Sequence, residues 1–176
     1  MADVWFTADT HWGHANIVKF CARPFPSVRE MNTALTENWN ARVKPGDTVY
    51  HLGDFSWGDQ RPYLKHLNGA IVLIRGSHDK NIKPGFQAVH DLLVLRDVAP
   101  VPIVLCHYAF RIWPSSHYGA WHLYGHSHCH LPPYGKSFDV GVDCHNYAPI
   151  SLDEVVEIME TLPDNPNLVR PRTPTV

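Results

Sequence analysis

The sequence has no long hydrophobic run, little excess charge and few cysteines. No stretch of its 176 residues reaches the roughly 18 consecutive apolar residues that a membrane-spanning helix needs. The first residues lack the basic region and apolar run of a signal peptide, so we expect a cytoplasmic protein. A formal net charge of −2 argues against a large basic surface for duplex nucleic acid or an anionic membrane. The four cysteines form no CxxC pair, and we interpret them as reduced thiols: Cys21, Cys106, Cys129 and Cys144.

What the sequence does have is histidine, which occurs 13 times. Because histidine is the commonest metal ligand, the positions of these residues decide whether they are functional. The length suits one domain with a substantial core. We predict a single domain over residues 1–162, followed by a loose proline-rich tail over residues 163–176.

Helical and extended patterns alternate in the first half of the chain, and strands follow one another in the second half. Helices are predicted over 27–43, where Ser27 and Glu30 form a capping box, over 60–67, and over 152–162, where Ser151 and Glu154 form another. Strands are predicted over 3–9, 48–54, 70–76, 91–97, 101–107, 121–128 and 137–143. This order predicts an α/β fold whose sheets are covered by helices.

Reactive side chains stand at or just past the ends of five predicted strands. They are Asp9, Asp54, His78, His107 and His126. Ligand sites in open α/β sheets collect at the carboxyl ends of the strands. The sequence therefore predicts that these side chains converge on one rim.

The residue types at this rim suit metal ions. His126 and His128 are two imidazoles separated by one residue after an apolar strand, which favours metal binding. Taken singly, Asp9 with His11 is explained as well by a surface turn, and His107 by a hydrogen-bonded core histidine. Taken together, the imidazoles and carboxylates suit two divalent ions that share a bridging ligand. The absence of thiolates from the set favours Mn²⁺, Fe or Zn²⁺.

In chain order, these segments resemble the calcineurin-like metallophosphoesterases. The motifs are Asp-x-His at 9–11, Gly-Asp at 53–54, Gly-x-His-Asp at 76–79, His107 after a strand, and Gly-His-x-His at 125–128. The likeness covers residues 3–145, and "DTHWGHANIV", "ARPF", "NWN" and "VGVDCHNYAPISLDEV" are similar to small stand-alone bacterial and phage members. The resemblance implies a four-layer α-β-β-α fold, in which two packed mixed β-sheets are flanked by helices.

The resemblance also implies a role for each matched residue. Asp9, His11 and His128 would bind the first metal, His107 and His126 the second, and Asp54 both. Position 77 carries Ser where the family has a ligating Asn, so Ser77 is expected to be a weaker ligand of the second metal. His78 would protonate the leaving oxygen or stabilise charge on the phosphoryl group, and Asp79 would orient the His78 imidazole.

The function implied is hydrolysis of a phosphodiester by in-line attack of a metal-bridging hydroxide. Two divalent ions are implied, with Mn²⁺ first and Fe, Zn, Ni or Co as alternatives. The substrate would be a small phosphoester, with a nucleotide or 2′,3′-cyclic nucleotide as candidates. A phosphomonoesterase, a nuclease of the same family or a metal-depleted scaffold are the alternative functions.

Three further residues are candidates for substrate contacts. His14 lies near His11 in sequence, although the start of a helix explains it equally well. Arg23 and Arg75 could bind phosphate oxygens, since a guanidinium fork matches them, although packing or surface roles explain arginines equally well.

Overall fold

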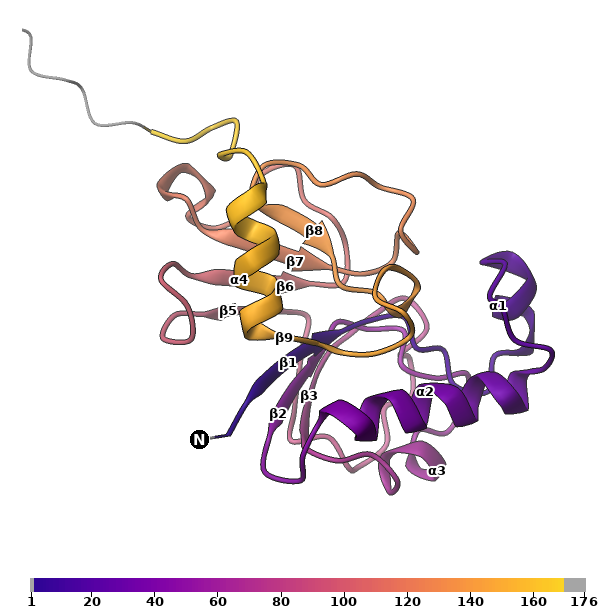
Figure 1. Cartoon of the computed structure of the whole chain (residues 1–176). Coiled ribbons are helices and arrows are strands. Elements are labelled where there is room, and N and C mark those ends of the chain that lie inside the picture. The colour runs from indigo at the N-terminus through magenta and orange to yellow at the C-terminus, as the bar shows by residue number, and fades with distance from the viewer. Residues whose placement is uncertain (1, 170–176) are drawn as a thin grey trace, which may run out of the picture.

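The computed structural model describes residues 2–169, which fold around two β-sheets packed against each other (Figure 1). In the first sheet the strand order is β4–β3–β2–β1–β9, and only β9 is antiparallel to its neighbour. In the second sheet the order is β5–β6–β7–β8, and only β5 is antiparallel to its neighbour. The strands are β1 (Val4–Thr7), β2 (Thr48–His51), β3 (Ala70–Ile74), β4 (Ala88–His90), β5 (Leu92–Leu95), β6 (Ile103–Cys106), β7 (Trp121–Tyr124), β8 (Ser137–Asp139) and β9 (Ile150–Ser151).

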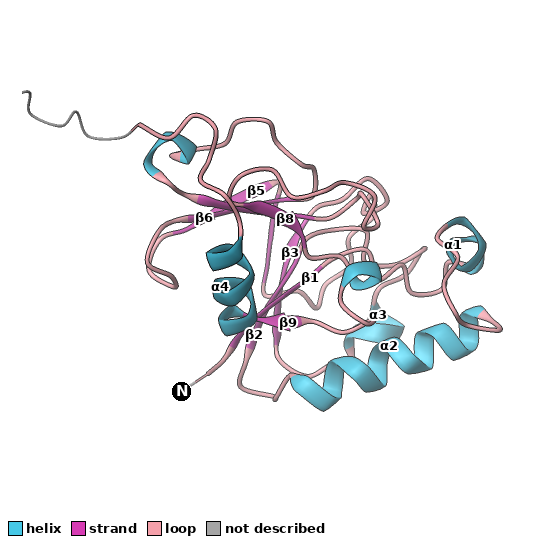
Figure 2. Cartoon of the chain, turned by 45° about the horizontal axis from the view of Figure 1, so that its top comes forward, coloured by secondary structure: helices cyan, strands magenta, loops and turns pink. Residues whose placement is uncertain are grey.

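The helices are α1 (Ala15–Phe20), α2 (Val28–Arg42), α3 (Arg61–Leu64) and α4 (Leu152–Thr161). The hydroxyl of Ser27 accepts a hydrogen bond from the first turn of α2, and α4 begins with a complete capping box between Ser151 and Glu154. Figure 2 shows α1, α2 and α3 on one side of the molecule, apart from α4. Within the described part of the chain, none of the helices combines the length and apolar character that a membrane span requires.

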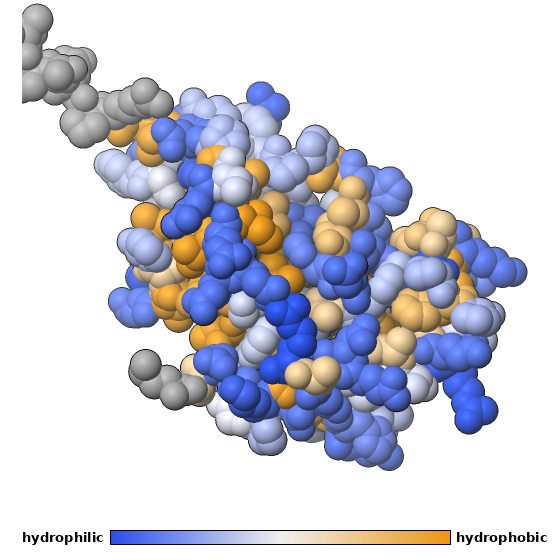
Figure 3. Space-filling model, in the orientation of Figure 1, coloured by the Kyte–Doolittle hydropathy of each residue, from blue (hydrophilic) through white to orange (hydrophobic). Residues whose placement is uncertain are grey.

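The main core lies between the two sheets. Alternate residues of each sheet point inward, among them Phe6, Leu52, Ile74, Ile103, Leu105 and Leu123. Helix α4 adds Val155 and Met159 to this core, and hydrophobic surface along α4 is visible in Figure 3. A second core joins the outer face of the first sheet to α2 through Met31, Leu35 and Trp39, which repeat at helical spacing.

The outer face of the second sheet differs from the prediction. Among residues 2–169 it is covered by loops and a short 3-10 turn, η1 (Ser116–Tyr118), instead of a helix. Trp113 packs there on Val104, with Phe110 and Tyr134 beside them. The structure is therefore a mixed α/β fold with two sheets, in which the α-helices of the outer layers cover only the first sheet.

The predicted loose tail is wrong for its first part. Asn165 is only 3% exposed and its side-chain amide donates to the carbonyl oxygens of Ser116 and Ala120 at 2.8 and 3.0 Å. Its amide oxygen accepts from the backbone N–H of Lys136 at 2.7 Å. These bonds, together with those from the Asn167 amide to the Ser116 hydroxyl and from the Val169 N–H to the His117 carbonyl, tie residues 163–169 to the loops that cover the second sheet. Residues 170–176 lie outside the described part of the chain.

Several strands end earlier than the sequence predicted. The predicted strands 48–54, 121–128 and 137–143 end at His51, Tyr124 and Asp139. The residues beyond those ends form turns, and these turns carry most of the candidate ligands. The short elements α1, β4 and β9 were not predicted, because so few residues show no clear period.

Candidate metal centre

The candidate ligands meet where strands of both sheets end. Asp9 and Asp54 follow the neighbouring parallel strands β1 and β2, and His107 and His126 follow the neighbouring parallel strands β6 and β7. Backbone hydrogen bonds continue past the strands, from the Asp9 N–H to the Gly53 carbonyl and from the Gly125 N–H to the His107 carbonyl, both 3.0 Å long. The two sheets therefore present these side chains at a common edge, as predicted.

The turns at this edge have an unusual backbone conformation. Five candidate ligands that are not glycine have a positive φ: Asp9 at 57°, His11 at 51°, Asp54 at 55°, His126 at 66° and His128 at 46°. The left-handed conformation costs an ordinary residue about 1–2 kcal/mol. Backbone strain of this kind collects at functional sites, where the fold holds side chains in a required direction. Gly76 permits the close packing, since a Cβ there would lie 2.3 Å from Asp54 Oδ1.

Asp9, His11 and His128 form the first group of potential ligands. One potential ligand atom from each lies within 4.8 Å of the others. Asp9 Oδ1 and both ring nitrogens of His11 are buried and have no hydrogen-bond partner among the described residues. Burial raises the pKa of Asp9 and lowers the pKa of His11, so a neutral imidazole with a free lone pair faces the carboxyl group. A buried polar atom without a partner costs about 1–3 kcal/mol, and a bound cation would satisfy such acceptors.

Asp54, His107 and His126 form the second group, with ligand atoms again within 4.8 Å of one another. The Nδ1 of His107 donates to the Leu52 carbonyl oxygen at 2.7 Å, which leaves the lone pair on Nε2. Burial lowers the pKa of His107 and favours this neutral form. The His107 Nε2 is buried without a hydrogen-bond partner in residues 2–169.

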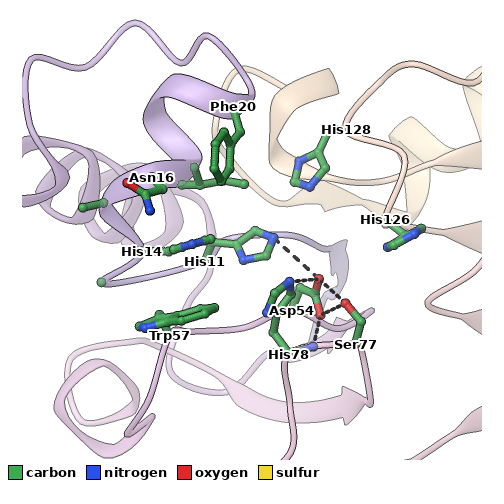
Figure 4. A pocket seen from close by; sticks show the side chains of 13 residues that line it. His11, His14, Asn16, Phe20, Asp54, Trp57, Ser77, His78, His126 and His128 are labelled. Carbon is green, nitrogen blue, oxygen red and sulfur yellow. Dashed lines mark hydrogen bonds and ion pairs between the residues drawn. The ribbon is translucent and has the colours of Figure 1, made fainter.

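Asp54 lies between the two groups. Its Oδ2 is 3.6 Å from His11 Nε2 and 3.5 Å from His107 Nε2. The other oxygen, Oδ1, accepts from the backbone N–H of His78 at 2.8 Å. The Ser77 hydroxyl donates to Asp54 at 3.1 Å (Figure 4), so its nearest partner is the carboxylate that both groups face.

His78 faces the cavity, but Asp79 does not orient it. The side chain of His78 is 40% exposed, and its Nε2 is 3.9 Å from Asp54 Oδ2. Asp79 is fully buried and accepts from the backbone N–H groups of Asp54, Phe55 and Gly76 at 2.7, 3.1 and 2.9 Å. These bonds occupy both of its oxygens. The expectation for Asp79 is therefore corrected: its carboxylate supports the turn that carries Asp54.

Arg23 also differs from its expected role. It is only 4% exposed, and its Nε and Nη2 donate to the two oxygens of Asp143, both at 2.8 Å. Further hydrogen bonds from Nη1 and Nη2 reach the carbonyl oxygens of Thr10 and Asp9 at 3.1 and 2.6 Å. A guanidinium engaged in this way cannot bind substrate, so Arg23 is a support of the site.

The partner of Arg23 orients a candidate ligand. Asp143 Oδ2 accepts from His128 Nδ1 at 2.8 Å, which leaves His128 Nε2 as the ligand atom. Burial opposes a charge on His128, but the hydrogen bond to Asp143 and the nearby Asp9 raise its pKa to about 10. This part of the site therefore favours a positive charge, whether a proton or a metal ion. The Cys21 thiol also lies within ligand distance of His128 and Asp143, but Asp143 is already bound by Arg23.

Of the two other residues predicted to contact substrate, one lines the cavity and one does not. Arg75 is on the surface, where its Nη1 pairs with Asp91 at 2.5 Å, and it does not line the cavity. His14 does line the cavity and stacks on Trp57, with ring centres 4.5 Å apart and planes inclined by 8°. The structure thus retains His14 as a substrate candidate and removes Arg75.

A cavity of about 590 Å³ opens beside the candidate ligands (Figure 4). One side is polar and carries Asp54, Ser77 and several histidines. The other side is apolar, where Phe20 is 74% exposed and Trp57 57% exposed. Exposed aromatic rings beside a polar cluster are suited to hold the organic part of a substrate.

The sequence reasoning missed the acidic residues that support the ligands. Besides Asp143, these include Asp139, whose Oδ2 accepts from the Ser127 hydroxyl and from the Cys129 N–H. Both aspartates belong to "FDVGVD", which was interpreted only as a strand. Their position at a strand end, like that of Asp9 and Asp54, was the signal that could have identified them.

Comparison with known proteins gives a family but no activity. The uncharacterized protein MJ1445 of Methanocaldococcus jannaschii is 38% identical over 172 residues, which cover 91% of this chain and 93% of that protein. The Gene 66 proteins of Mycobacterium phages D29 and L5 are 36% and 33% identical over 86 and 85 residues, which is 42% and 41% of their own length. No family model matches the chain.

Solved structures support the fold. The crystal structure of a protein of unknown function, AQ665 from Aquifex aeolicus, superposes with a TM-score of 0.71 and 26% identity, covering 90% of this chain and all of that one. A predicted phosphoesterase from Streptococcus pneumoniae matches with a TM-score of only 0.40 and 17% identity, over 80% of this chain and 71% of that one, which carries no argument about function. By its likeness over nearly the full length, the chain belongs to the same family as MJ1445 of Methanocaldococcus jannaschii.

Proposed function

We propose that this protein is a phosphoesterase that depends on two divalent metal ions and belongs to the calcineurin-like superfamily. The observation that carries the proposal is the position of Asp54, whose Oδ2 lies 3.6 and 3.5 Å from ring nitrogens of His11 and His107. Both nitrogens are buried without a hydrogen-bond partner in the described chain. We further propose that the two sheets form the metallophosphoesterase fold, with loops in place of the helical layer on the second sheet.

The donor atoms fit hard or borderline divalent cations. Each group contains one carboxylate and two imidazoles, a set that suits Mn²⁺, Fe and Zn²⁺, with Ni²⁺ and Co²⁺ as alternatives. We propose Mn²⁺ first. Asp9, His11 and His128 would hold one ion and His107 and His126 the other, with Asp54 in contact with both. When bound, such a metal pair lowers the pKa of a bound water and polarises a phosphoryl oxygen.

The other residues around the cavity would bind the ester and protonate its leaving group. His78 is close to Asp54 and reaches solvent, so it can deliver a proton to the departing oxygen. Trp57, Phe20 and His14 would contact the organic part of the ester.

We favour a phosphodiester over a monoester. The cavity is about 590 Å³, and a second hollow of about 300 Å³ lies beyond Trp57 and shares His78 with it. Two hollows that meet at the proposed proton donor can take the two arms of a diester. The aromatic wall supports a planar group on one arm, as in a nucleotide or a 2′,3′-cyclic nucleotide. A phosphomonoesterase, a nuclease and a metal-depleted scaffold remain the alternatives.

The proposal is tested by metal content and hydrolysis on the same preparation. We expect elemental analysis to find up to two divalent ions per chain after Mn²⁺ loading, and Mn²⁺-dependent cleavage of bis-p-nitrophenyl phosphate. Faster cleavage of p-nitrophenyl phosphate would reject the diester preference, and cleavage of labelled DNA would favour the nuclease. A protein that binds no metal and cleaves none of these esters would be a scaffold.

Asp143→Asn should weaken metal binding. Asp143 Oδ2 accepts from both His128 and Arg23, and Oδ1 accepts from Arg23, so an asparagine must turn its NH2 group toward one of these donors. Loss of a group that orients a ligating histidine reduces metal affinity by about 10–100-fold. Titration calorimetry with Mn²⁺ measures this effect. Asp59→Asn is the matched control, because it removes an aspartate bound by Arg61 on the surface, and an unchanged affinity in Asp143→Asn would contradict the orienting role.

Ser77→Asn should strengthen the second metal site. A hydroxyl is a poorer ligand than an amide oxygen, and Ser77 donates to Asp54 at 3.1 Å instead. We expect the variant to bind its second Mn²⁺ more tightly and to show higher activity at limiting metal. Ser115→Asn is the control, because it makes the same substitution at another serine. Ser115 has a φ of 60°, a conformation that asparagine tolerates. Equal affinities and rates in wild type and Ser77→Asn would show that position 77 does not bind metal.

A further inference from the structure

A second hollow adjoins the candidate metal centre and differs in its chemistry from the main cavity. Its volume is about 300 Å³, roughly half that of the main cavity, and both are lined by Trp57 and His78. The other residues that line it are Ser56, Gly58, Gln60, Lys80 and Asn81. Among the described residues, the main cavity is lined by the Asp54 carboxylate and by no lysine or arginine, whereas the second hollow is lined by a lysine and by no carboxylate. The two hollows therefore suit different chemical groups.

Lys80 gives the second hollow a positive charge that the protein leaves available. The ion pairs of lysine and arginine within residues 2–169 do not include Lys80. The two aspartates that neighbour the hollow in sequence are engaged elsewhere. Asp59 accepts from Arg61 Nη2 at 2.6 Å, and Asp79 is buried and accepts from three backbone N–H groups. The ammonium group of Lys80 is thus free to bind an anion.

Gln60 adds a hydrogen-bond donor from a buried position. It is only 2% exposed, and its Oε1 accepts from the backbone N–H of Lys83 at 3.0 Å. A backbone N–H can only donate, so this bond identifies the oxygen of the amide and leaves its NH2 group as a donor. The same bond fastens the segment that carries Lys80 and Asn81 to the residue that precedes α3. An ammonium group beside amide donors is a set that suits a phosphate group.

We propose that the second hollow binds a further phosphate group, so that the substrate is a phosphodiester with a small phosphorylated alcohol as one arm. Lys80 would pair with this phosphate, and the amides of Gln60 and Asn81 would donate to it. The other arm would be the planar group in the main cavity. A volume of about 300 Å³ is at the lower limit of ligand pockets and favours a small alcohol over a second nucleoside. The identity of the substrate rests on the function proposed above, whereas binding of a phosphate at Lys80 does not.

The experiment compares three esters of thymidine 5′-phosphate that differ in the charge of the second arm. The arms are glycerol, which is neutral, glycerol 3-phosphate, which is anionic, and choline, which is cationic. We expect the Mn²⁺-loaded protein to cleave the glycerol 3-phosphate ester with a kcat/KM about fivefold above that of the glycerol ester, since one exposed ion pair has an effect of about this size. The choline ester should be cleaved most slowly, and added salt should reduce the preference.

Variants at position 80 test whether the lysine causes the preference. Lys80→Ala should remove it and Lys80→Arg should restore it, because arginine keeps the charge. Lys44→Ala is the matched control and should keep the preference. Lys44 is an exposed lysine that pairs with Asp3 at 3.6 Å, and it precedes β2, whereas the site lies beyond the other end of that strand.

Titration calorimetry in EDTA measures binding of the same esters without cleavage. We expect about fivefold tighter binding of the glycerol 3-phosphate ester than of the glycerol ester in the wild type, and no difference in Lys80→Ala. Equal values for these two esters in both measurements would overturn the phosphate site, and a preference that persists in Lys80→Ala would overturn the role of Lys80. Faster cleavage of the dinucleotide pTpT, whose phosphorylated alcohol is a second nucleotide, would overturn the small arm. If none of the esters is cleaved with Mn²⁺, the proposed function fails, and the titration in EDTA still decides whether the hollow binds a phosphate.

Discussion

Asp54→Ala is expected to lower metal-dependent phosphoester hydrolysis by about 10³-fold or more. Asp54 is the carboxylate that faces both ligand groups, at 3.6 Å from His11 and 3.5 Å from His107. Metal-ion catalysis contributes several kcal/mol, and about 4 kcal/mol corresponds to 10³ in rate. Loss of this carboxylate should damage both sites, whereas loss of a single histidine should damage one.

Metal stoichiometry and thermal unfolding separate this effect from misfolding. Ligands that bind only the folded state stabilise it, so Mn²⁺ should raise the melting temperature of the wild type over its value in EDTA. In Asp54→Ala this difference should shrink, and fewer ions per chain should be found. Asp91→Ala is the matched control, because it removes an exposed aspartate that pairs with Arg75 on the surface. Two tightly bound ions in Asp54→Ala would argue strongly against a shared carboxylate.

His78→Ala is expected to lower turnover by about 10²-fold while metal binding stays nearly intact. Loss of a positioned general acid has an effect of about this size. The His78 side chain reaches the cavity, and only its backbone N–H is hydrogen bonded to Asp54. The alanine variant therefore keeps the bond that holds Asp54. Esters with good leaving groups need little protonation, so p-nitrophenyl esters should suffer less than alkyl esters.

The dependence on leaving group distinguishes proton donation from a merely structural role. The assay compares an aryl and an alkyl phosphodiester in the wild type, in His78→Ala and in His66→Ala, where His66 is an exposed histidine. A uniform loss for both esters would exclude proton transfer to the leaving group. A loss of bound metal in His78→Ala would show that His78 is a ligand.

Much of the fold was predictable because it depends on local patterns. Residues 27–43 and 152–162 were recognised from capping residues and helical spacing, and helices α2 and α4 begin where predicted. Strands over 91–97 and 101–107 were also expected, and the structure has β5 and β6 there, paired antiparallel. Strand ends were placed too late, because the predicted strands ran on into turns in which Asp54, His126 and His128 have positive φ values.

The tail shows why a composition argument failed. Residues 163–176 have four prolines and few apolar side chains, which is typical of a loose segment. Asn165 nevertheless docks through three hydrogen bonds to residues 29 to 49 positions away in sequence. A composition cannot reveal such a contact, because it depends on backbone groups of a distant loop that only the tertiary structure brings within reach.

The sequence by itself determined which side chains meet at the rim. Parallel neighbouring strands end at the same edge of a sheet, so Asp9 meets Asp54 beyond β1 and β2, and His107 meets His126 beyond β6 and β7. The packing of the two sheets then brings these two pairs together. Only the tertiary structure decided what supports those residues. Arg23 and Asp143 are separated by 120 positions, and Asp54 and Asp79 by 25. The residue types do not distinguish the two roles, because arginine and aspartate suit a substrate contact as well as a buried support. The direction of a side chain is set by packing between segments that are distant in sequence, and no local pattern records that packing.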